Sequence, residues 1–226
     1  MFKKLLIKFF KHFTNPVQSI MFDLRSIYFQ YCKFQLTKIH KLKIPKSEVF
    51  FKTDYCDLYN LYKIVIKRKP NRVVEIGSGF STWVIAKALE ENKKKYQINP
   101  IFYSLEQDTK YKILIENFLK KNLKIKTKNF IKIIKTDLMI TKFKDTTVSI
   151  CKNFPKDKID FLYEDRTDHE KFPIAGDAII LEKKMSNKYC ICVDGMKPTV
   201  DFYKSNLSRK YNIEGGFFHG CTFYPK

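Results

Sequence analysis

The chain has 226 residues, 44% of them hydrophobic and 15% aromatic, which suits one domain with a modest extension and disfavours both two full domains and wholesale disorder. Its net charge of +21 would suit a nucleic-acid or anionic-membrane partner. Only five of the 44 basic residues are arginine, the residue that recognises phosphate and guanine through paired hydrogen bonds. The composition therefore predicts a solvated, lysine-rich surface and disfavours nucleic acid as the partner.

The six cysteines show no CxxC pair and no paired spacing typical of a zinc site. Cys190 and Cys192 flank Ile191 in an apolar run, which predicts small buried thiols in a strand. The sequence therefore predicts reduced cysteines, a cytoplasmic protein and no metal cluster.

Residues 1–70 form a basic, aromatic extension with fifteen lysines and arginines against four acids. Within residues 1–13, apolar side chains recur at helical spacing among lysines, which predicts an amphipathic helix. Such a helix suits peripheral contact with an anionic membrane, or packing against the domain or a partner protein. It lacks the cleavage site of a signal peptide, and the sequence has no run of about 18 apolar residues to span a membrane. The apolar pattern of residues 55–65 predicts a second helix before the first strand, and a helix in this place often covers a cofactor pocket.

From residue 71 to residue 226, short β-branched runs alternate with helical patterns, which is typical of βαβ units around a parallel sheet. The predicted strands are 72–76, 100–105, 130–135, 159–164, 189–193, 210–214 and 217–224, and the predicted helices are 81–92, 108–121, 174–187 and 198–208. Gly215 and Gly216 join the last two strands and leave no room for a crossover helix, so those strands must pair antiparallel. The sequence therefore predicts an α/β domain, a Rossmann-like three-layer sandwich whose seven-stranded, mostly parallel sheet ends in an antiparallel hairpin.

The strand 72–76 runs into a glycine-rich turn, after which the next helix begins at once. Gly77 and Gly79 place no side chain between the backbone and a ligand, and the free N–H groups at the start of the helix attract a negatively charged group. The stretch VVEIGSGFST resembles the first motif of class I S-adenosylmethionine-dependent methyltransferases, in the branch whose glycine loop reads GSGxST. Ser81 stands where the commoner family pattern has a third glycine, and Thr82 stands where a dinucleotide fingerprint has Gly or Ala.

The resemblance implies that the cofactor is S-adenosyl-L-methionine and that the turn holds its methionine carboxylate. The implied cofactor-binding residues in and before the turn are Glu75, Gly77, Ser78, Gly79, Ser81 and Thr82. Glu75 would lie near the cationic sulfonium. Glu106, followed by Gln107, ends the second strand, where a carboxylate accepts the ribose hydroxyls of this cofactor or of NAD. Asp137, with Leu138 beside it, resembles the family's adenine-contacting acid. For each position a plain alternative stays open: Glu106 would be a solvated acid after a strand, and Asp137 would belong to an ordinary turn.

The strand 159–164 delivers acids and a histidine to the edge where ligands bind in such sheets. In related sequences this strand ends in Asp-Gly followed shortly by His, so Asp165 and His169 are the implied catalytic residues, with Arg166 in place of the glycine. Methyl transfer is an in-line displacement, and either side chain would remove a proton from the acceptor. Asp194 and Asp165 form a weak candidate for a divalent metal site, which the glycine after Asp194 disfavours because catechol-type relatives carry Asn there.

The sequence therefore predicts an S-adenosylmethionine-dependent methyltransferase that acts on a small-molecule or sugar-type acceptor, with O-methylation favoured. The signature of amino N-methyltransferases of bases, Asn or Asp followed by Pro-Pro and an aromatic, is absent after the fourth strand. Three alternatives stay open: a non-catalytic membrane- or partner-associated module with the same fold, an NAD-dependent oxidoreductase, and a basic RNA methyltransferase.

Overall fold

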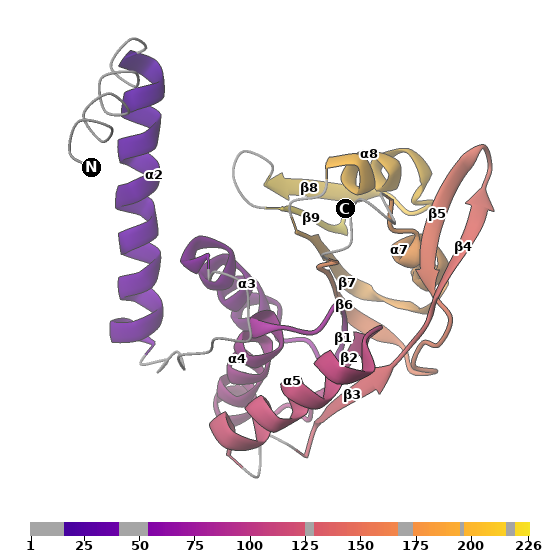
Figure 1. Ribbon diagram of the computed structural model, residues 1–226, viewed down its shortest axis with the longest axis horizontal. Coiled ribbons are helices and arrows are strands. Elements are labelled where there is room, and N and C mark those ends of the chain that lie inside the picture. Colours follow the sequence, from indigo (N-terminus) through magenta and orange to yellow (C-terminus); the bar gives the residue numbers. More distant parts are fainter. Residues whose placement is uncertain (1–15, 41–53, 125–128, 167–173, 195–196, 216–219) are drawn as a thin grey trace.

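The structure is a computed structural model, and it describes residues 16–40, 54–124, 129–166, 174–194, 197–215 and 220–226 (Figure 1). The predicted helix over residues 1–13 and the candidate catalytic residue His169 lie outside the described residues. The described chain forms one central sheet covered on both faces, with a long helix at the N-terminal side (Figure 1).

The central sheet has seven strands in the order β3-β2-β1-β6-β7-β9-β8. These strands are β1 (Arg72–Ile76), β2 (Ile101–Glu106), β3 (Ile131–Lys135), β6 (Ile159–Glu164), β7 (Met185–Val193), β8 (Tyr211–Gly215) and β9 (Cys221–Pro225). The first five in spatial order pair in parallel, whereas β9 pairs antiparallel with both β7 and β8. The predicted mostly parallel sheet with a terminal antiparallel hairpin is confirmed.

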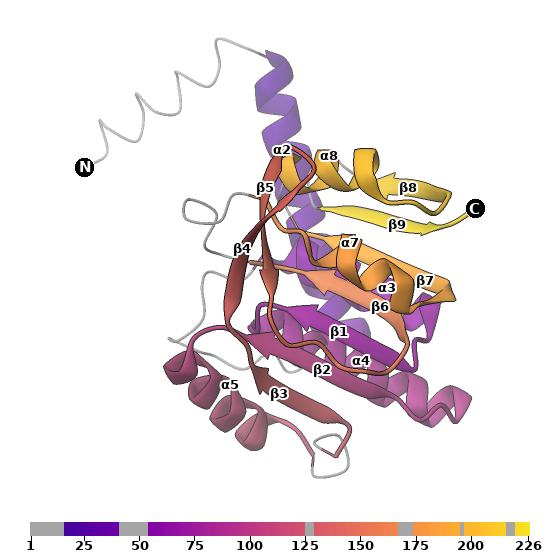
Figure 2. The same cartoon turned by 90° about the vertical axis from the view of Figure 1, so that its right-hand side faces the viewer.

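Helices cover one face of the sheet, and a mixture of helices and a β-ribbon covers the other (Figures 1 and 2). The first face carries α3 (Tyr55–Arg68), α4 (Phe80–Tyr96) and α5 (Thr109–Asn122), and the second carries the β4–β5 ribbon, α7 (Asp177–Leu181), the 3-10 turn Glu182–Lys184 and α8 (Lys197–Asn206). Successive strand residues alternate between the two apolar clusters beneath these layers: Val73 belongs to the first cluster and Val74 to the second. The three-layer prediction is confirmed, as is the helix predicted before the first strand, which is α3.

The β4–β5 ribbon was not predicted. It consists of β4 (Leu138–Phe143) and β5 (Thr146–Cys151), paired antiparallel, and Figure 2 shows it standing across one face of the sheet. The two strands meet in a two-residue turn where Lys144 has a φ of 52°, a conformation usually marked by Asn or Gly. The turn Lys144–Asp145 contains Asp but no Asn or Gly, so the strongest sequence signal of a two-residue hairpin is missing.

The predicted helix over 174–187 is wrong in its second half. The α-helix ends at Leu181, and β7 already begins at Met185. Arg209 donates from its guanidinium to the main-chain carbonyls of Met185 (3.0 Å) and the next residue (3.1 Å), while Glu182 accepts the N–H of Arg209 (2.8 Å). These tertiary contacts hold the start of β7 extended and override a helical sequence pattern.

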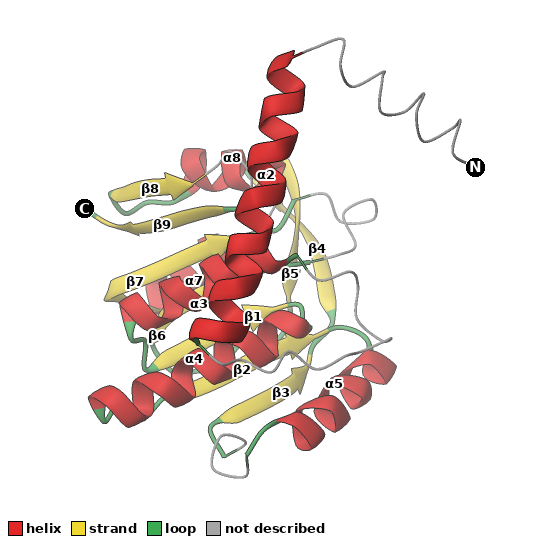
Figure 3. Cartoon of the chain, turned by 90° about the vertical axis from the view of Figure 1, so that its left-hand side faces the viewer, coloured by secondary structure: helices red, strands yellow, loops and turns green. Residues whose placement is uncertain are grey.

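The long helix α2 (Pro16–Phe34) continues into a π-helical turn at Gln35–Ile39 and extends beyond the helical layer (Figures 1 and 3). Near its C-terminal end, Cys32 and Leu36 are buried in the same apolar cluster as the residues of α3. Tyr28 Oη donates to Asn60 Oδ1 of α3 (3.1 Å). Among the described residues, none of the helices is both long and apolar enough to cross a bilayer.

Candidate functional site

The glycine turn after β1 is fixed by the strands on both sides of it. Gly77 has a φ of +91°, its N–H donates to the carbonyl of Leu105 (2.9 Å), and a Cβ at this position would lie 1.8 Å from the carbonyl oxygen of Asp165. Gly79 differs, because a Cβ there would meet only Ser81 Oγ, at 3.7 Å. Gly77 is therefore required by the close approach of β6, whereas Gly79 leaves open space beside the start of α4.

Glu75 anchors this turn from inside the protein. Its carboxylate is fully buried and accepts hydrogen bonds from the hydroxyls of Ser81 (2.6 Å), Thr82 (2.7 Å) and Ser104 (2.6 Å). Thr82 Oγ1 also accepts the N–H of Gly79 (2.9 Å). Burial raises the pKa of Glu75 to about 8, against the lowering effect of the three hydroxyls. Glu75 thus holds the first turn of α4 against the sheet.

Glu106, at the end of β2, lies beside the same turn. Its two carboxylate oxygens accept the N–H of Ser78 (3.1 Å) and the N–H of Asp108 (2.8 Å). Ser78 Oγ is hydrogen-bonded to Ser104 Oγ (2.7 Å), which joins this pair to the Glu75 network. Burial raises the pKa of Glu106, while the backbone N–H donors lower it. The structure therefore brings together Glu106 and the glycine turn, and Gln107 follows on the surface.

Asp137 and Leu138 do not join this network. The Asp137 carboxylate is exposed and pairs with Lys135 Nζ (2.8 Å), and this hydrogen bond lowers the pKa of Asp137. Leu138 begins β4 and packs against the apolar cluster under the ribbon. The chain between β3 and β4 still reaches the edge of the sheet, because the N–H of Thr136 donates to the carbonyl of Glu106 (2.9 Å).

Asp165 lies next to Gly77 at the carboxyl edge of the sheet, where its N–H donates to the carbonyl of Ile76 (2.9 Å). Burial and the nearby charge of Asp194 raise the pKa of Asp165 to about 7. Asp194 follows β7, and Tyr163 Oη donates to its Oδ2 (3.3 Å). A carboxyl group whose pKa lies near neutrality can exchange a proton at physiological pH.

Helix α3 covers this part of the edge. A hollow between α3 and strands β6, β7 and β9 is lined by polar groups that include Asp57, Asn60, Tyr163, Asp194 and Thr222. Burial, followed by the charge of Asp194, raises the pKa of Asp57 to about 8, and Arg25 of α2 acts in the opposite direction. Within the described ranges, no three acidic, histidine or cysteine side chains are placed to hold a metal ion together.

Arg166, which stands where the motif that this sequence resembles has a glycine, points away from this edge. Its guanidinium donates to Ser149 Oγ (2.6 Å) and forms ion pairs with Glu164 Oε1 (3.2 Å) and with Asp177, all of them buried. Tyr203 Oη donates to the other oxygen of Glu164 (2.5 Å). Arg166 therefore ties β6 to β5 and α7 beneath the sheet.

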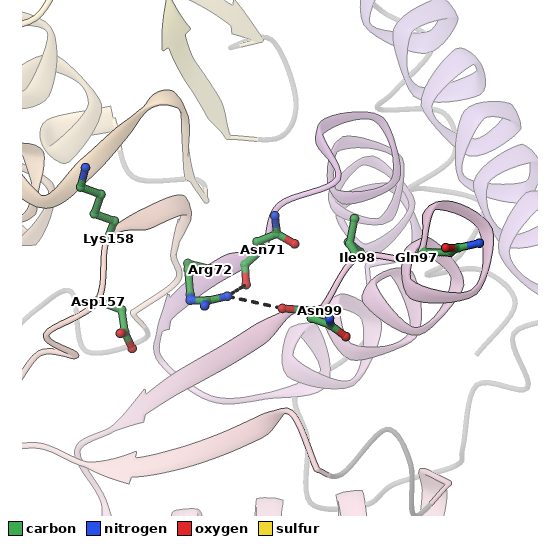
Figure 4. Close-up of a pocket in the computed structure, with 7 residues that line it drawn as sticks. All are labelled: Asn71, Arg72, Gln97, Ile98, Asn99, Asp157 and Lys158. Atoms are coloured by element: carbon green, nitrogen blue, oxygen red, sulfur yellow. Dashed lines mark hydrogen bonds between the residues drawn. The ribbon is translucent and has the colours of Figure 1, made fainter.

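A second, larger hollow lies at the opposite edge of the sheet (Figure 4). Its volume is about 690 Å³, and it is lined by Asn71, Arg72, Gln97, Ile98, Asn99, Asp157 and Lys158. Arg72 Nη1 donates to the carbonyls of Asn71 (3.1 Å) and Asn99 (3.4 Å) there, as Figure 4 shows. Because these residues precede or begin β1, β2 and β6, this hollow lies at the amino ends of the strands, away from the glycine turn.

Three residues of the site were missed from the sequence. Ser104 faces Glu75 across the β1–β2 register and links it to Ser78. Tyr163 follows Phe161 and Leu162 in the apolar middle of β6, and Asp57 belongs to the helix before the sheet. Of the three, only Asp57 carried a sequence signal that could have placed it in the candidate site, because it is an acid within the apolar stripe of a helix.

By sequence, the chain matches no family model and no curated protein. By structure, it is similar to an S-adenosylhomocysteine-bound methyltransferase of Podospora anserina, PaMTH1, with a TM-score of 0.51 and 13% identity over 90% of this chain and 88% of that one. It is also similar to an O-methyltransferase of Bacillus cereus in complex with S-adenosylhomocysteine, with a TM-score of 0.52 and 9% identity over 88% and 97% of the two chains. It is similar, too, to the O-methyltransferase TomG of Streptomyces achromogenes in complex with S-adenosylmethionine, with a TM-score of 0.51 and 11% identity over 89% of this chain and 99% of that one. These likenesses show that the chain has the Rossmann-like fold of these methyltransferases.

Proposed function

We propose that the chain is an S-adenosylmethionine-dependent methyltransferase of the class I branch whose first motif reads GSGxST, and that it methylates oxygen on a small-molecule or sugar-type acceptor. The observation that carries the proposal is the pairing of the open glycine turn with the buried carboxylate of Glu106, held 3.1 Å from the N–H of Ser78. Support for the cofactor and for O-methylation comes from the similar solved structures, which are methyltransferases bound to this cofactor or its product.

The residues at the edge fit this cofactor chemically. Each oxygen of Glu106 accepts one backbone N–H and keeps capacity for a further donor, so the carboxylate would bind the two ribose hydroxyls. The open side of Gly79 and the N–H groups that begin α4 would take the methionine carboxylate. The cofactor supplies an electrophilic methyl group on a sulfonium.

The chain's own part in the reaction is to orient the acceptor and to take its proton. Asp165 is the proposed base, because it lies next to Gly77 at this edge and its pKa of about 7 allows it to hold a proton released near neutral pH. The hollow under α3, at about 40 Å³, is too small for such an acceptor, so the proposed place for the acceptor is the sheet edge beside Asp165 and Asp194.

We expect calorimetric titration to show micromolar binding of S-adenosylmethionine and S-adenosylhomocysteine. Glu106→Ala should weaken it by about 10- to 100-fold, because two hydrogen bonds to a charged group are lost. Glu116→Ala, which removes a carboxylate on the surface of α5, is the matched control and should bind like the wild type. Binding of NADH alone, or no binding of the adenosyl ligands, would overturn the proposed function.

The pH dependence of the activity tests the role of Asp165. Since the deprotonated form takes the proton, activity should fall as the pH drops through about 7. Asp194→Asn removes a like charge, so it should lower the pKa of Asp165 and move this acid limb to lower pH, by on the order of half a unit to one unit. The limb is measured as kcat/KM against pH, and the pKa by carboxyl-carbon NMR titration. Asp201→Asn, on the exposed side of α8, should leave both unchanged. If the acid limb of Asp194→Asn stays at the wild-type pH or moves to higher pH, Asp165 is excluded as the base.

A further inference from the structure

The hollow of about 690 Å³ at the amino ends of β1, β2 and β6 lies apart from the glycine turn, and the methyl transfer proposed above does not use it (Figure 4). Three short segments line it: Asn71 and Arg72 at the start of β1, residues 97–99 between α4 and β2, and Asp157 and Lys158 before β6. Its volume lies within the range of small-molecule sites. Every lining side chain except that of Ile98 is polar or charged, so the hollow suits a hydrophilic ligand.

Arg72 is held in this hollow by both its main chain and its side chain. Asp160 Oδ2 accepts the N–H of Arg72 (2.9 Å), and Arg72 Nη1 donates to the carbonyls of Asn71 (3.1 Å) and Asn99 (3.4 Å). Within the part of the chain that the structure describes, Nη2 and Nε of Arg72 have no such partner. Those two nitrogens can donate side by side to two oxygens of one phosphate group. Because the guanidinium is already fixed, binding an anion there costs less conformational entropy.

The charges along the hollow favour a ligand that carries a phosphate group. Lys158 is exposed and, among the described residues, has no ion-pair partner. Asp157 is the one acid in the described lining, and its Oδ2 accepts the hydroxyl of Tyr103 (2.5 Å). The lining therefore carries two positive charges against one negative charge. A phosphate monoester carries about −1.5 to −2 charges at neutral pH, so the two cations can neutralise it.

The other lining side chains favour a hydroxyl-rich ligand over a nucleobase. The amides of Asn71, Gln97 and Asn99 can each donate and accept hydrogen bonds, as the hydroxyl groups of a sugar do, and the second carboxylate oxygen of Asp157 can accept one more. A base that is bound from solution or from a single strand stacks on aromatic side chains. None of the described residues that line the hollow is aromatic. The lining therefore matches a sugar phosphate better than a nucleotide or a nucleic-acid strand.

We propose that this hollow is a second binding site, which takes a sugar phosphate. Arg72 and Lys158 bind the phosphate group, and the amides of Asn71, Gln97 and Asn99 bind the sugar hydroxyls. The site lies at the opposite edge of the sheet from the glycine turn, so both sites can be occupied at once. This inference does not rest on the proposed methyl transfer.

The test is calorimetric titration of the full-length protein with glucose 6-phosphate, with glucose as the probe that lacks the phosphate. The wild type should bind glucose 6-phosphate with a Kd of roughly 10–500 µM and should not bind glucose measurably. Arg72→Gln and Lys158→Gln should each weaken binding at least about 10-fold, because each removes a charged hydrogen-bond donor. Lys142→Gln, which removes the same charge from an exposed position of β4, is the matched control and should bind like the wild type.

Circular dichroism and the melting temperature show whether Arg72→Gln keeps the fold. Lys158 is exposed, so Lys158→Gln tests the site without removing a packed side chain. The proposal is overturned if the wild type does not bind glucose 6-phosphate at concentrations up to about 10 mM, or if Lys142→Gln weakens binding as much as Lys158→Gln. Uridine 5′-monophosphate tests the nucleotide alternative with a base other than adenine. If it binds more tightly than glucose 6-phosphate and loses this binding in Lys158→Gln, the hollow is a nucleotide site and the sugar phosphate is excluded.

Discussion

Gly77→Ala is expected to destabilise the protein by about 3–5 kcal/mol, and to remove cofactor binding with it. Two costs combine at this position. The backbone has a φ of +91°, which disfavours any residue with a Cβ, and the new Cβ would lie 1.8 Å from the carbonyl oxygen of Asp165. That carbonyl belongs to backbone at the end of β6 and has no rotamer by which to move aside, so the strands themselves must separate.

Gly79→Ala is the control for this change, because the same methyl group would touch nothing closer than 3.7 Å in an extended stretch of backbone. We expect Gly79→Ala to melt near the wild-type temperature and Gly77→Ala to melt about 10 °C lower. The measurement is thermal unfolding followed by circular dichroism, with calorimetric titration of S-adenosylhomocysteine on each variant. Equal melting temperatures for the two variants would contradict the close approach of β6 to the turn.

The second large effect is expected at Arg166. Arg166→Met should cost about 3–5 kcal/mol, because it leaves the carboxylates of Glu164 and Asp177 buried without their counter-charge. Lys197→Met, which breaks an exposed ion pair with Asp201, should leave stability unchanged within error. The unfolding free energy of both variants is measured by urea unfolding at neutral pH. If Arg166→Met loses as little unfolding free energy as Lys197→Met, the buried ion pairs do not contribute to folding stability.

The loss of unfolding free energy in Arg166→Met should depend on pH. Burial raises the pKa of Glu164, and the guanidinium of Arg166 opposes that rise. Without the guanidinium, the folded-state pKa of Glu164 lies still further above its unfolded value, so the folded state binds the extra proton and loses stability as the pH rises between the two values. The gap between the variant and the wild type should therefore be smaller at pH 5 than at pH 8.

The parts of the molecule that local pattern decides were predictable. The strands and helices around the glycine turn follow from apolar runs that alternate with helical patterns, and the place of Glu106 at the end of a strand follows from the same pattern. The acid network beneath the turn was not found, because the contact between Glu75 and Ser104 depends on the register of two strands whose pairing the sequence does not state.

The parts of the fold that were predicted wrongly or missed depend on contacts between residues far apart in the sequence. The early start of β7 depends on Arg209, which lies more than twenty residues away in sequence. The β4–β5 ribbon turns at Lys144 and Asp145 without Asn or Gly, so the usual local signal of a tight hairpin is missing. Arg166 stands where the resembled motif has a glycine, which suggests a departure at the candidate catalytic edge, yet its side chain is bound to Ser149 and Glu164 beneath the sheet.

All six cysteines lie among the described residues, and all are buried as free thiols. Burial raises the pKa of several of them, to about 12 for Cys151, so thiolate is scarce until the surrounding structure opens. The rate of alkylation at each sulfur therefore reports how often its own region opens. Cys32 and Cys56 report on the packing of α2 against α3, and Cys190 on the centre of the sheet. Without any engineered label, the chain can thus show whether its N-terminal helices and its sheet open together or one at a time.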